Sequence, residues 1–126
     1  MSLSFSVVPG DFAVARLPPA APVPDWAQPG RFWSATRTAE ELSIVCAESS
    51  VPPEVRAERG WALLQLRGPF PFEQVGVLDS FLRPLAAAGV SVFAIATFDT
   101  DYVLVKSGRL PDALSALAAA GHEYRA

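Results

Sequence analysis

The stretch GVSVFAIATFDTDYVLVK, residues 89–106, decides the predicted fold. Val90 to Phe98 is a nearly continuous run of β-branched, aromatic and small apolar residues, which is typical of a strand. Asp99-Thr100-Asp101 consists of residue types that favour a turn, and Tyr102 to Lys106 is expected to return as a second strand. The stretch therefore predicts a β-hairpin. Both alternating sets of the first strand are apolar, which predicts burial on two sides and a cover for the second face.

Helical patterns lie on either side of this hairpin. A strand is expected over Trp61–Arg67, and apolar residues at helical spacing predict a helix over Phe72–Gly89, with a kink in its last turn at Pro84. A second helix over Pro111–Gly121 and a final edge strand over His122–Arg125 complete the pattern. The order β-α-β-β-α-β predicts an antiparallel sheet with both helices on one face.

The first half of the chain carries a weaker version of the same pattern. Glu41 to Val45 resembles Asp101 to Val105, so we expect an internal repeat whose first helix has shrunk to a proline-rich stretch. The prediction is an α+β protein with an abbreviated unit over residues 1–60 and a full unit over residues 61–126. The expected elements of the first unit are strands over Leu3–Val8 and Phe12–Leu17 joined by a Pro9-Gly10 turn, a polyproline connection over Pro18–Pro24, strands over Phe32–Thr38 and Leu42–Ala47, and a short helix or helical turn over Val51–Gly60.

Composition excludes several classes of function. The 126 residues are 51% hydrophobic and 18% charged, which predicts a folded domain with a tendency to self-associate. A net charge of -3 lacks the basic excess that a nucleic-acid partner requires. One Cys46 and one His122 provide neither a disulfide nor a zinc site, and we expect no cofactor. Pro84 to Phe98, the longest uncharged stretch, is too short for a membrane helix, and without a signal-peptide pattern we expect a cytoplasmic protein.

Several blocks resemble the small bacterial tandem ACT-domain proteins, which are similar in turn to the ACT repeats of aspartate kinases and to CASTOR-type arginine sensors. The most specific block is the run from Pro84 to Val105, with T-F-D-T-D-Y after A-G-V-S-V-F. The other matching pieces are Gly76–Leu78, Pro9–Leu17, Phe32–Thr38, Glu41–Val45 and Glu58–Trp61. The resemblance implies two ferredoxin-like ACT units, with antiparallel sheets and helices on one face. It also implies no catalysis, a free amino acid bound at an interface between units, a homodimer and a regulated protein partner.

The resemblance places the ligand loops at the strand-to-helix turn 68–76 and at the hairpin 97–101. Independently, the first amides of a helix lack internal partners and favour an anion such as an α-carboxylate. A carboxylate at the hairpin can receive an ammonium. The candidate ligand-binding residues are Gly68, Glu73, Gly76, Val77, Thr97, Phe98, Asp99, Thr100 and Asp101.

Each of these features also has a purely structural interpretation. Glu73 could only complement the helix N-terminus, and Asp99 and Asp101 could only form turn contacts. The three tryptophans are expected in a core or interface, Cys46 in the core and His122 at the surface. We predict a non-catalytic amino-acid sensor. A module that binds proteins but no small ligand is the alternative, and an enzyme with Asp99 or Asp101 as general base is the weakest hypothesis because nothing nearby activates either residue.

Overall fold

The structure, a computed structural model, describes residues 1–126 and divides into two compact units. The helical unit contains residues 1–9 and 62–126, and the strand unit contains residues 10–61. Two strands, β1 (Ser4–Leu17) and β4 (Ala57–Leu66), contribute residues to both units. The first nine residues thus group with the second half of the chain, whereas the sequence pattern suggested a single division after residue 60.

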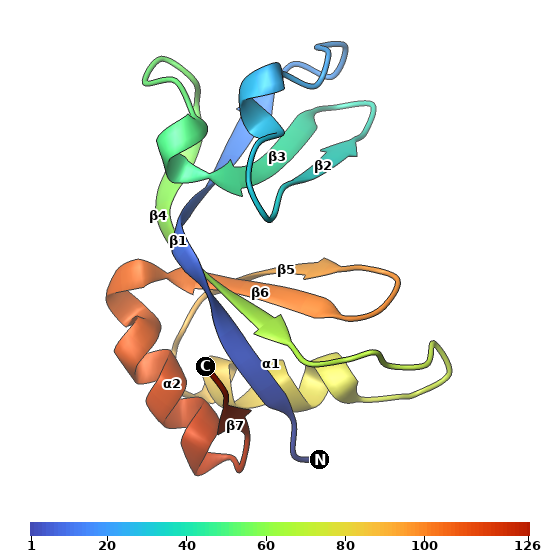
Figure 1. Cartoon of the computed structure of the whole chain (residues 1–126), viewed down its shortest axis with the longest axis vertical. Helices are drawn as coiled ribbons and strands as arrows, with labels where there is room; N and C mark the ends of the chain where they lie inside the picture. Colours follow the sequence, from blue (N-terminus) through green and yellow to red (C-terminus); the bar gives the residue numbers. More distant parts are fainter. The chain divides into compact units, whose positions relative to one another are not determined.

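The helical unit carries the full β-α-β-β-α-β pattern and one extra strand. After β4 follow α1 (Val77–Ala87), β5 (Val92–Ala96), β6 (Asp101–Lys106), a 3-10 turn (Ser107–Arg109), α2 (Leu110–Ala119) and β7 (Glu123–Tyr124). The strand order in this unit is β7-β1-β4-β6-β5, with both helices against one face (Figure 1). This mixed α+β arrangement confirms the predicted ferredoxin-like fold class.

One apolar core joins the sheet of this unit to its helices. Val77, Phe81 and Leu85 recur every four residues and present one buried stripe of α1. Phe81 is fully buried and meets the ring of Phe5 edge to face, with 5.3 Å between centroids. Burying a side chain of this size contributes about 2 to 3 kcal/mol. The other buried members are Leu3, Ala62, Leu64, Leu66, Val90, Val103, Val105, Ala113 and Leu117.

The extra strand is the start of β1, which lies between β4 and β7. It pairs with β7 in parallel, with Ser4 opposite Glu123 and Phe5 opposite Tyr124. Backbone bonds fix this register, since the Glu123 N–H donates to the Leu3 carbonyl at 2.8 Å. An uninterrupted β-α-β-β-α-β chain would place β7 directly beside β4. The N-terminal residues therefore complete a sheet whose other strands come from residues 62–126.

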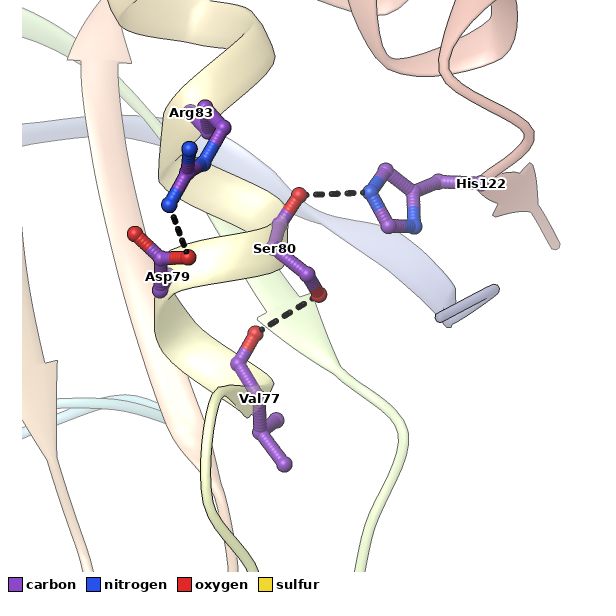
Figure 2. A network of polar contacts seen from close by, with 5 residues as sticks. All are labelled: Val77, Asp79, Ser80, Arg83 and His122. Carbon is purple, nitrogen blue, oxygen red and sulfur yellow. Dashed lines mark hydrogen bonds and ion pairs between the residues drawn. The ribbon is translucent and has the colours of Figure 1, made fainter.

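A buried histidine connects this inserted strand to α1. His122 is 6% exposed, so the expectation of a surface histidine is wrong. Its Nδ1 accepts the Leu3 N–H at 3.1 Å, and therefore the proton is on Nε2, which donates to the Ser80 carbonyl at 2.9 Å (Figure 2). That carbonyl needs a donor because Pro84, four residues on, has no N–H. We call Leu3, Ser80, Pro84 and His122 the histidine latch.

The strand unit contains no α-helix, in line with an abbreviated unit. Its strands are ordered β2-β3-β1-β4, where β2 is Ser34–Arg37 and β3 is Leu42–Ala47, and its 3-10 turns are Asp25–Ala27 and Glu48–Ser50. Cys46 is fully buried as expected. Burial raises the pKa of its thiol, and Arg59 opposes this shift by a smaller amount. The other buried residues of this core are Ala13, Ala15, Ala27, Leu42, Ile44 and Val51.

Two local predictions are wrong and a third holds only in part. The Pro9-Gly10 turn is instead part of a continuous β1, in which Gly10 has a φ of 95° that accommodates a local irregularity. Of the short helix or helical turn expected over Val51–Gly60, only a turn forms, closed by the Val55 N–H that donates to the Pro52 carbonyl at 3.1 Å. Val51 precedes a proline and is extended, with a ψ of 121°. The first long helix begins at Val77 rather than Phe72, because Gly76 is left-handed with a φ of 86°.

The expected two-sided burial of β5 is also wrong for the single chain. Phe93 and Ile95 are only half-buried, and Ala94 and Ala96 are exposed. The reason is topological, since β5 is an edge strand and pairs only with β6.

Among the tryptophans, Trp61 is buried, Trp26 packs against the strand-unit core and Trp33 is 40% exposed. Neither helix has the length and apolar character that crossing a bilayer demands.

Candidate functional site

A cavity of about 340 Å³ lies in the helical unit where α1 begins. Three segments line it, namely the loop residues 70–72 and 74, residues 76–79 at the start of α1, and residues 96–101 of the β5–β6 hairpin. These segments meet because a strand-to-helix turn and a hairpin emerge at the same end of the sheet. The position of the cavity therefore follows from the topology of this unit.

Short hydrogen bonds fix the hairpin side of this cavity. The Thr97 N–H and hydroxyl both donate to the Thr100 carbonyl, at 2.8 and 2.9 Å, and close a tight turn around Phe98 and Asp99. The Thr100 hydroxyl donates to the Leu66 carbonyl at 2.8 Å, which attaches the hairpin to the end of β4. Both threonines are thus occupied by structural bonds through their hydroxyl protons.

The loop side approaches the hairpin closely at Gly68. The Phe70 N–H donates to the Asp99 carbonyl at 2.9 Å. A Cβ on Gly68 would lie 2.7 Å from that carbonyl oxygen and 3.1 Å from the Cβ of Thr100, closer than side-chain atoms tolerate. Only glycine allows the loop and the hairpin to meet in this way.

The start of α1 presents backbone donors to the cavity. The first N–H groups of a helix, here those of Val77, Leu78 and Asp79, have no helical acceptor, whereas the Ser80 N–H already bonds the Gly76 carbonyl at 3.0 Å. Gly76 provides no side-chain cap. The Asp79 carboxylate points to Arg83, 2.7 Å away, in an exposed ion pair (Figure 2). The amide end of α1 therefore stays available to an anion.

Asp101 lies on the hairpin wall with its carboxylate half-buried. Asp101 is the first residue of β6 and lies two residues before Val103, which packs in the core between the sheet and the helices. Since alternate residues of a strand share a face, Asp101 is on the helix side of the sheet. Burial raises the pKa of its carboxyl. No hydrogen bond or ion pair satisfies the side chain of Asp101. A partly desolvated carboxylate without a partner favours a cationic or hydrogen-bond-donating ligand.

An aromatic pair lies at the rim of the cavity. The ring of Phe72, from the loop, meets the ring of Phe98, from the hairpin, edge to face with 4.9 Å between centroids. The two residues are 72% and 77% exposed. Val75, in the same loop as Phe72, is 87% exposed but does not line the cavity. The two rings therefore present exposed apolar surface at the cavity.

The structure brings most of the predicted residues together. Gly76, Val77 and the whole of Thr97–Asp101 line the cavity. Gly68 lines a neighbouring cavity of about 290 Å³ with Gln65 and Tyr102, and Glu73 is exposed and lines neither. Phe70, Phe72 and Gln74 also line the cavity and lie within the predicted ligand loop 68–76, but the sequence did not single them out as candidates. The unusual pattern of aromatic residues between prolines, Pro69-Phe70-Pro71-Phe72, is the signal that could have identified the two rings.

The chain contains no group of His, Cys, Asp and Glu side chains suited to a metal ion. The geometry thus describes a small ferredoxin-like domain with a ligand-sized cavity lined by the backbone at the start of α1, three aspartates and aromatic rings.

Comparison with known proteins identifies the family. A family model described as an ACT domain matches residues 56–119, half of the chain, and a model described as an N-terminal domain matches residues 10–54. The chain therefore belongs to the ACT-domain family, which confirms the resemblance predicted from its hairpin.

Solved structures agree with this assignment. A protein from Agrobacterium tumefaciens is 38% identical, covers 99% of this chain and 93% of its own, and superposes with a TM-score of 0.94. The aspartate kinase of Clostridium acetobutylicum is 12% identical over 89% of this chain and 33% of its own, with a TM-score of 0.65. The regulatory subunit of aspartate kinase from Thermus flavus is 11% identical over 95% of this chain and 97% of its own, with a TM-score of 0.61. The last two share the fold.

Proposed function

We propose that this chain is a non-catalytic regulatory protein that binds a free amino acid in the cavity at the start of α1. The observation that carries the proposal is the pairing of opposite polarities across one cavity, with unpartnered helix amides on one wall and the unpartnered Asp101 carboxylate on the other. Membership of the ACT family supports it, as does the likeness to a protein described as a regulatory subunit.

The cavity suits the two charged groups of an amino acid. Its volume of about 340 Å³ lies at the lower end of the range for small-molecule sites. The α-carboxylate would accept hydrogen bonds from the amides of Val77 and Leu78, where the helix dipole favours an anion. The α-ammonium would lie against Asp101 or Asp99. Gly76 leaves room beside the backbone, and Gly68 holds the loop against the hairpin.

The remaining predicted residues take supporting roles in this proposal. Thr97 and Thr100 shape the hairpin that carries Phe98, and they offer hydroxyl oxygens as acceptors. Glu73 lies outside the cavity of the free chain, so a contact with ligand would need a movement of its loop. We expect its replacement to have the smallest effect on binding.

We further propose that the chain forms a homodimer through β5. This edge strand, Val92–Ala96, contains no charge and no proline, the features that usually protect an exposed edge. Antiparallel pairing centred on Ala94 would bring that residue next to its own copy, so Ala94→Asp should place two like charges together and dissociate the dimer. Sedimentation velocity tests this, with Ser91→Asp, one residue outside the strand, as the control.

The test of ligand binding is a thermal-shift screen against the twenty amino acids at constant pH and salt. A ligand at about one hundred times its Kd stabilises the folded state by about 2.7 kcal/mol. For a chain of this size that raises Tm by about 10 °C. Asp101→Ala should abolish the shift, whereas Asp25→Ala, an exposed aspartate in the strand unit, should leave it intact.

The same screen tests the competing function. If no amino acid shifts the transition while Ala94→Asp still disrupts an assembly, the chain is a module that binds protein and no small ligand. The exposed apolar edge of β5 is the observation that favours this second function.

A further inference from the structure

We propose that the exposed side chains of Phe72, Val75 and Phe98 form a docking surface for a segment of another protein, one whose apolar side chains are flanked by lysine or arginine. Phe72 and Val75 come from the loop before α1, and Phe98 comes from the turn of the β5–β6 hairpin. We call these three residues the apolar patch. The patch can act whether or not a ligand occupies the cavity, so this role is additional to the proposed function.

The patch gathers the most exposed large apolar side chains of the chain. Phe72, Val75 and Phe98 are 72%, 87% and 77% exposed, whereas no other large apolar side chain is more than 60% exposed. None of the three belongs to the core of either unit. Val75 lies between Gln74 and Gly76, which line the same cavity as the two rings. Exposed apolar side chains that are gathered at one end of a domain are typical of an interaction site.

Backbone hydrogen bonds hold the two rings of the patch in place. The Gln74 N–H donates to the Pro71 carbonyl at 3.0 Å and closes the turn that carries Phe72. The hairpin turn that carries Phe98 is closed by its own bonds, and a backbone bond joins it to the loop. The two rings also contact each other, with 4.9 Å between centroids. Rings that are already fixed lose little conformational entropy when a partner binds, and such aromatic anchors dominate the binding energy of many interfaces.

The charge around the patch defines the chemistry of the partner. The loop, the start of α1 and the hairpin contain four acidic side chains and no basic one. Arg83 neutralises Asp79, and Asp101 lies in the cavity. Glu73 and Asp99, which directly follow the two rings in the sequence, are exposed and take part in no ion pair. An apolar centre with this acidic rim complements a segment that has apolar side chains and a basic rim.

The acidic rim also disfavours the other occupants of an exposed apolar patch. A second copy docked through the same patch would bring Glu73 and Asp99 close to their own copies, and like charges oppose such a contact. Anionic lipid headgroups and nucleic acid would meet the same repulsion. A segment of a different protein, with basic side chains around its apolar ones, is therefore the occupant that the charges favour.

The test uses a helical peptide built from leucine and lysine, with a leucine–glutamate peptide of the same pattern as its counterpart. Labelled peptide is titrated with the full chain in the absence of amino acids, and fluorescence anisotropy gives the Kd. The lysine peptide should bind, and the glutamate peptide should bind at least about 10-fold more weakly. A higher salt concentration should weaken the binding of the lysine peptide.

Two double variants separate the apolar contribution from the charges. Phe72→Ser with Phe98→Ser should raise the Kd of the lysine peptide about 10-fold or more, because it removes both aromatic anchors. Glu73→Lys with Asp99→Lys should raise this Kd about 3-fold to 10-fold at low salt and remove most of its salt dependence. All four side chains are exposed, so both variants should keep the circular dichroism spectrum and the Tm of the wild type.

The strand unit supplies matched controls. Trp33→Ser removes a ring that is 40% exposed, and Glu40→Lys with Glu54→Lys reverses two exposed carboxylates and makes the same change in net charge. Each control should leave the Kd of the lysine peptide within about 2-fold of the wild-type value, because neither touches the patch or its rim.

Equal binding of the two peptides, binding of neither, or a Kd that the serine double variant leaves unchanged would overturn the inference. Two further measurements test the other occupants. Flotation with neutral and with anionic phospholipid vesicles that depends on Phe72 and Phe98 would make the patch a membrane surface. A dimer that the serine double variant dissociates in sedimentation velocity would make it a contact between copies. Either result would overturn the assignment to a basic protein segment, and neither depends on the thermal-shift screen of the cavity.

Discussion

Replacement of His122 by alanine tests the histidine latch. The change removes the acceptor of the buried Leu3 N–H and the donor of the partly buried Ser80 carbonyl. An unsatisfied buried group costs about 1 to 3 kcal/mol, so we assign about 2 kcal/mol to the Leu3 N–H and about 1 kcal/mol to the Ser80 carbonyl. The free energy of unfolding should fall by about 3 kcal/mol, and Tm by about 10 °C.

Pro84 allows the two halves of this loss to be separated. Pro84→Ala restores an N–H four residues after Ser80, which can bond the Ser80 carbonyl within α1. In that background His122→Ala should cost only the Leu3 bond, about 2 kcal/mol, which leaves a coupling of about 1 kcal/mol between the two positions. Ser2→Ala, which removes an exposed bond to the Gly121 carbonyl at the same end of the unit, is the control and should cost at most about 0.5 kcal/mol.

Urea unfolding of the four variants, followed by far-ultraviolet circular dichroism, gives these free energies. Unchanged denaturant slopes would show that the variants unfold from equally compact native states. An equal cost of His122→Ala with and without Pro84 would refute the claim that the missing proline amide is what the imidazole replaces. A cost near zero would refute the latch itself.

Other substitutions test the core and the site. Gly68→Ala should destabilise the protein by about 1 to 3 kcal/mol in denaturant titration and weaken ligand binding, because its Cβ would meet the Asp99 carbonyl at 2.7 Å; Gly108→Ala, with no neighbour within 4 Å, should do neither. Phe81→Ala should cost about 3 to 5 kcal/mol of unfolding free energy, and a loss below about 1 kcal/mol would contradict its central place in the core. Asp101→Asn should raise Tm at neutral pH. Burial raises the pKa of the Asp101 carboxyl, so the folded state loses free energy of unfolding as pH rises through the titration of this group. A neutral asparagine removes that loss. The difference should vanish at a pH where Asp101 is protonated in both the folded and unfolded states, and a constant difference across a pH series would show another cause.

Local patterns predicted the elements that local chemistry determines. The β5–β6 hairpin and the second helix have nearly the expected bounds, since a turn sequence, Pro111 and Gly121 define their ends. The helix before the hairpin starts later than predicted because the backbone of Gly76 interrupts it. That shift also explains why Glu73 lies in the loop and not in the first helical turn.

Long-range pairing was beyond the reach of these patterns. The place of β1 between β4 and β7 depends on partners more than a hundred residues apart, such as Ser4 and Glu123. The burial of His122 depends on the same pairing, so a lone histidine near the end of the sequence gave no sign of its role. In the site, the grouping of Gly76 and Val77 with Thr97–Asp101 could be anticipated from the shared end of the sheet, but the contact between Phe72 and Phe98 could not.

The inserted strand also determines the order in which strand pairings can form during synthesis. Residues 4 and 5 leave the ribosome more than a hundred residues before residues 123 and 124, which form their parallel partner strand. The strand unit, residues 10–61, has all of its own segments available much earlier. Residues 4 and 5 therefore cannot pair with β7 until the whole helical unit has been synthesised. Because pairings between segments far apart in the sequence form slowly, we expect the β1–β7 contact to be among the last to form.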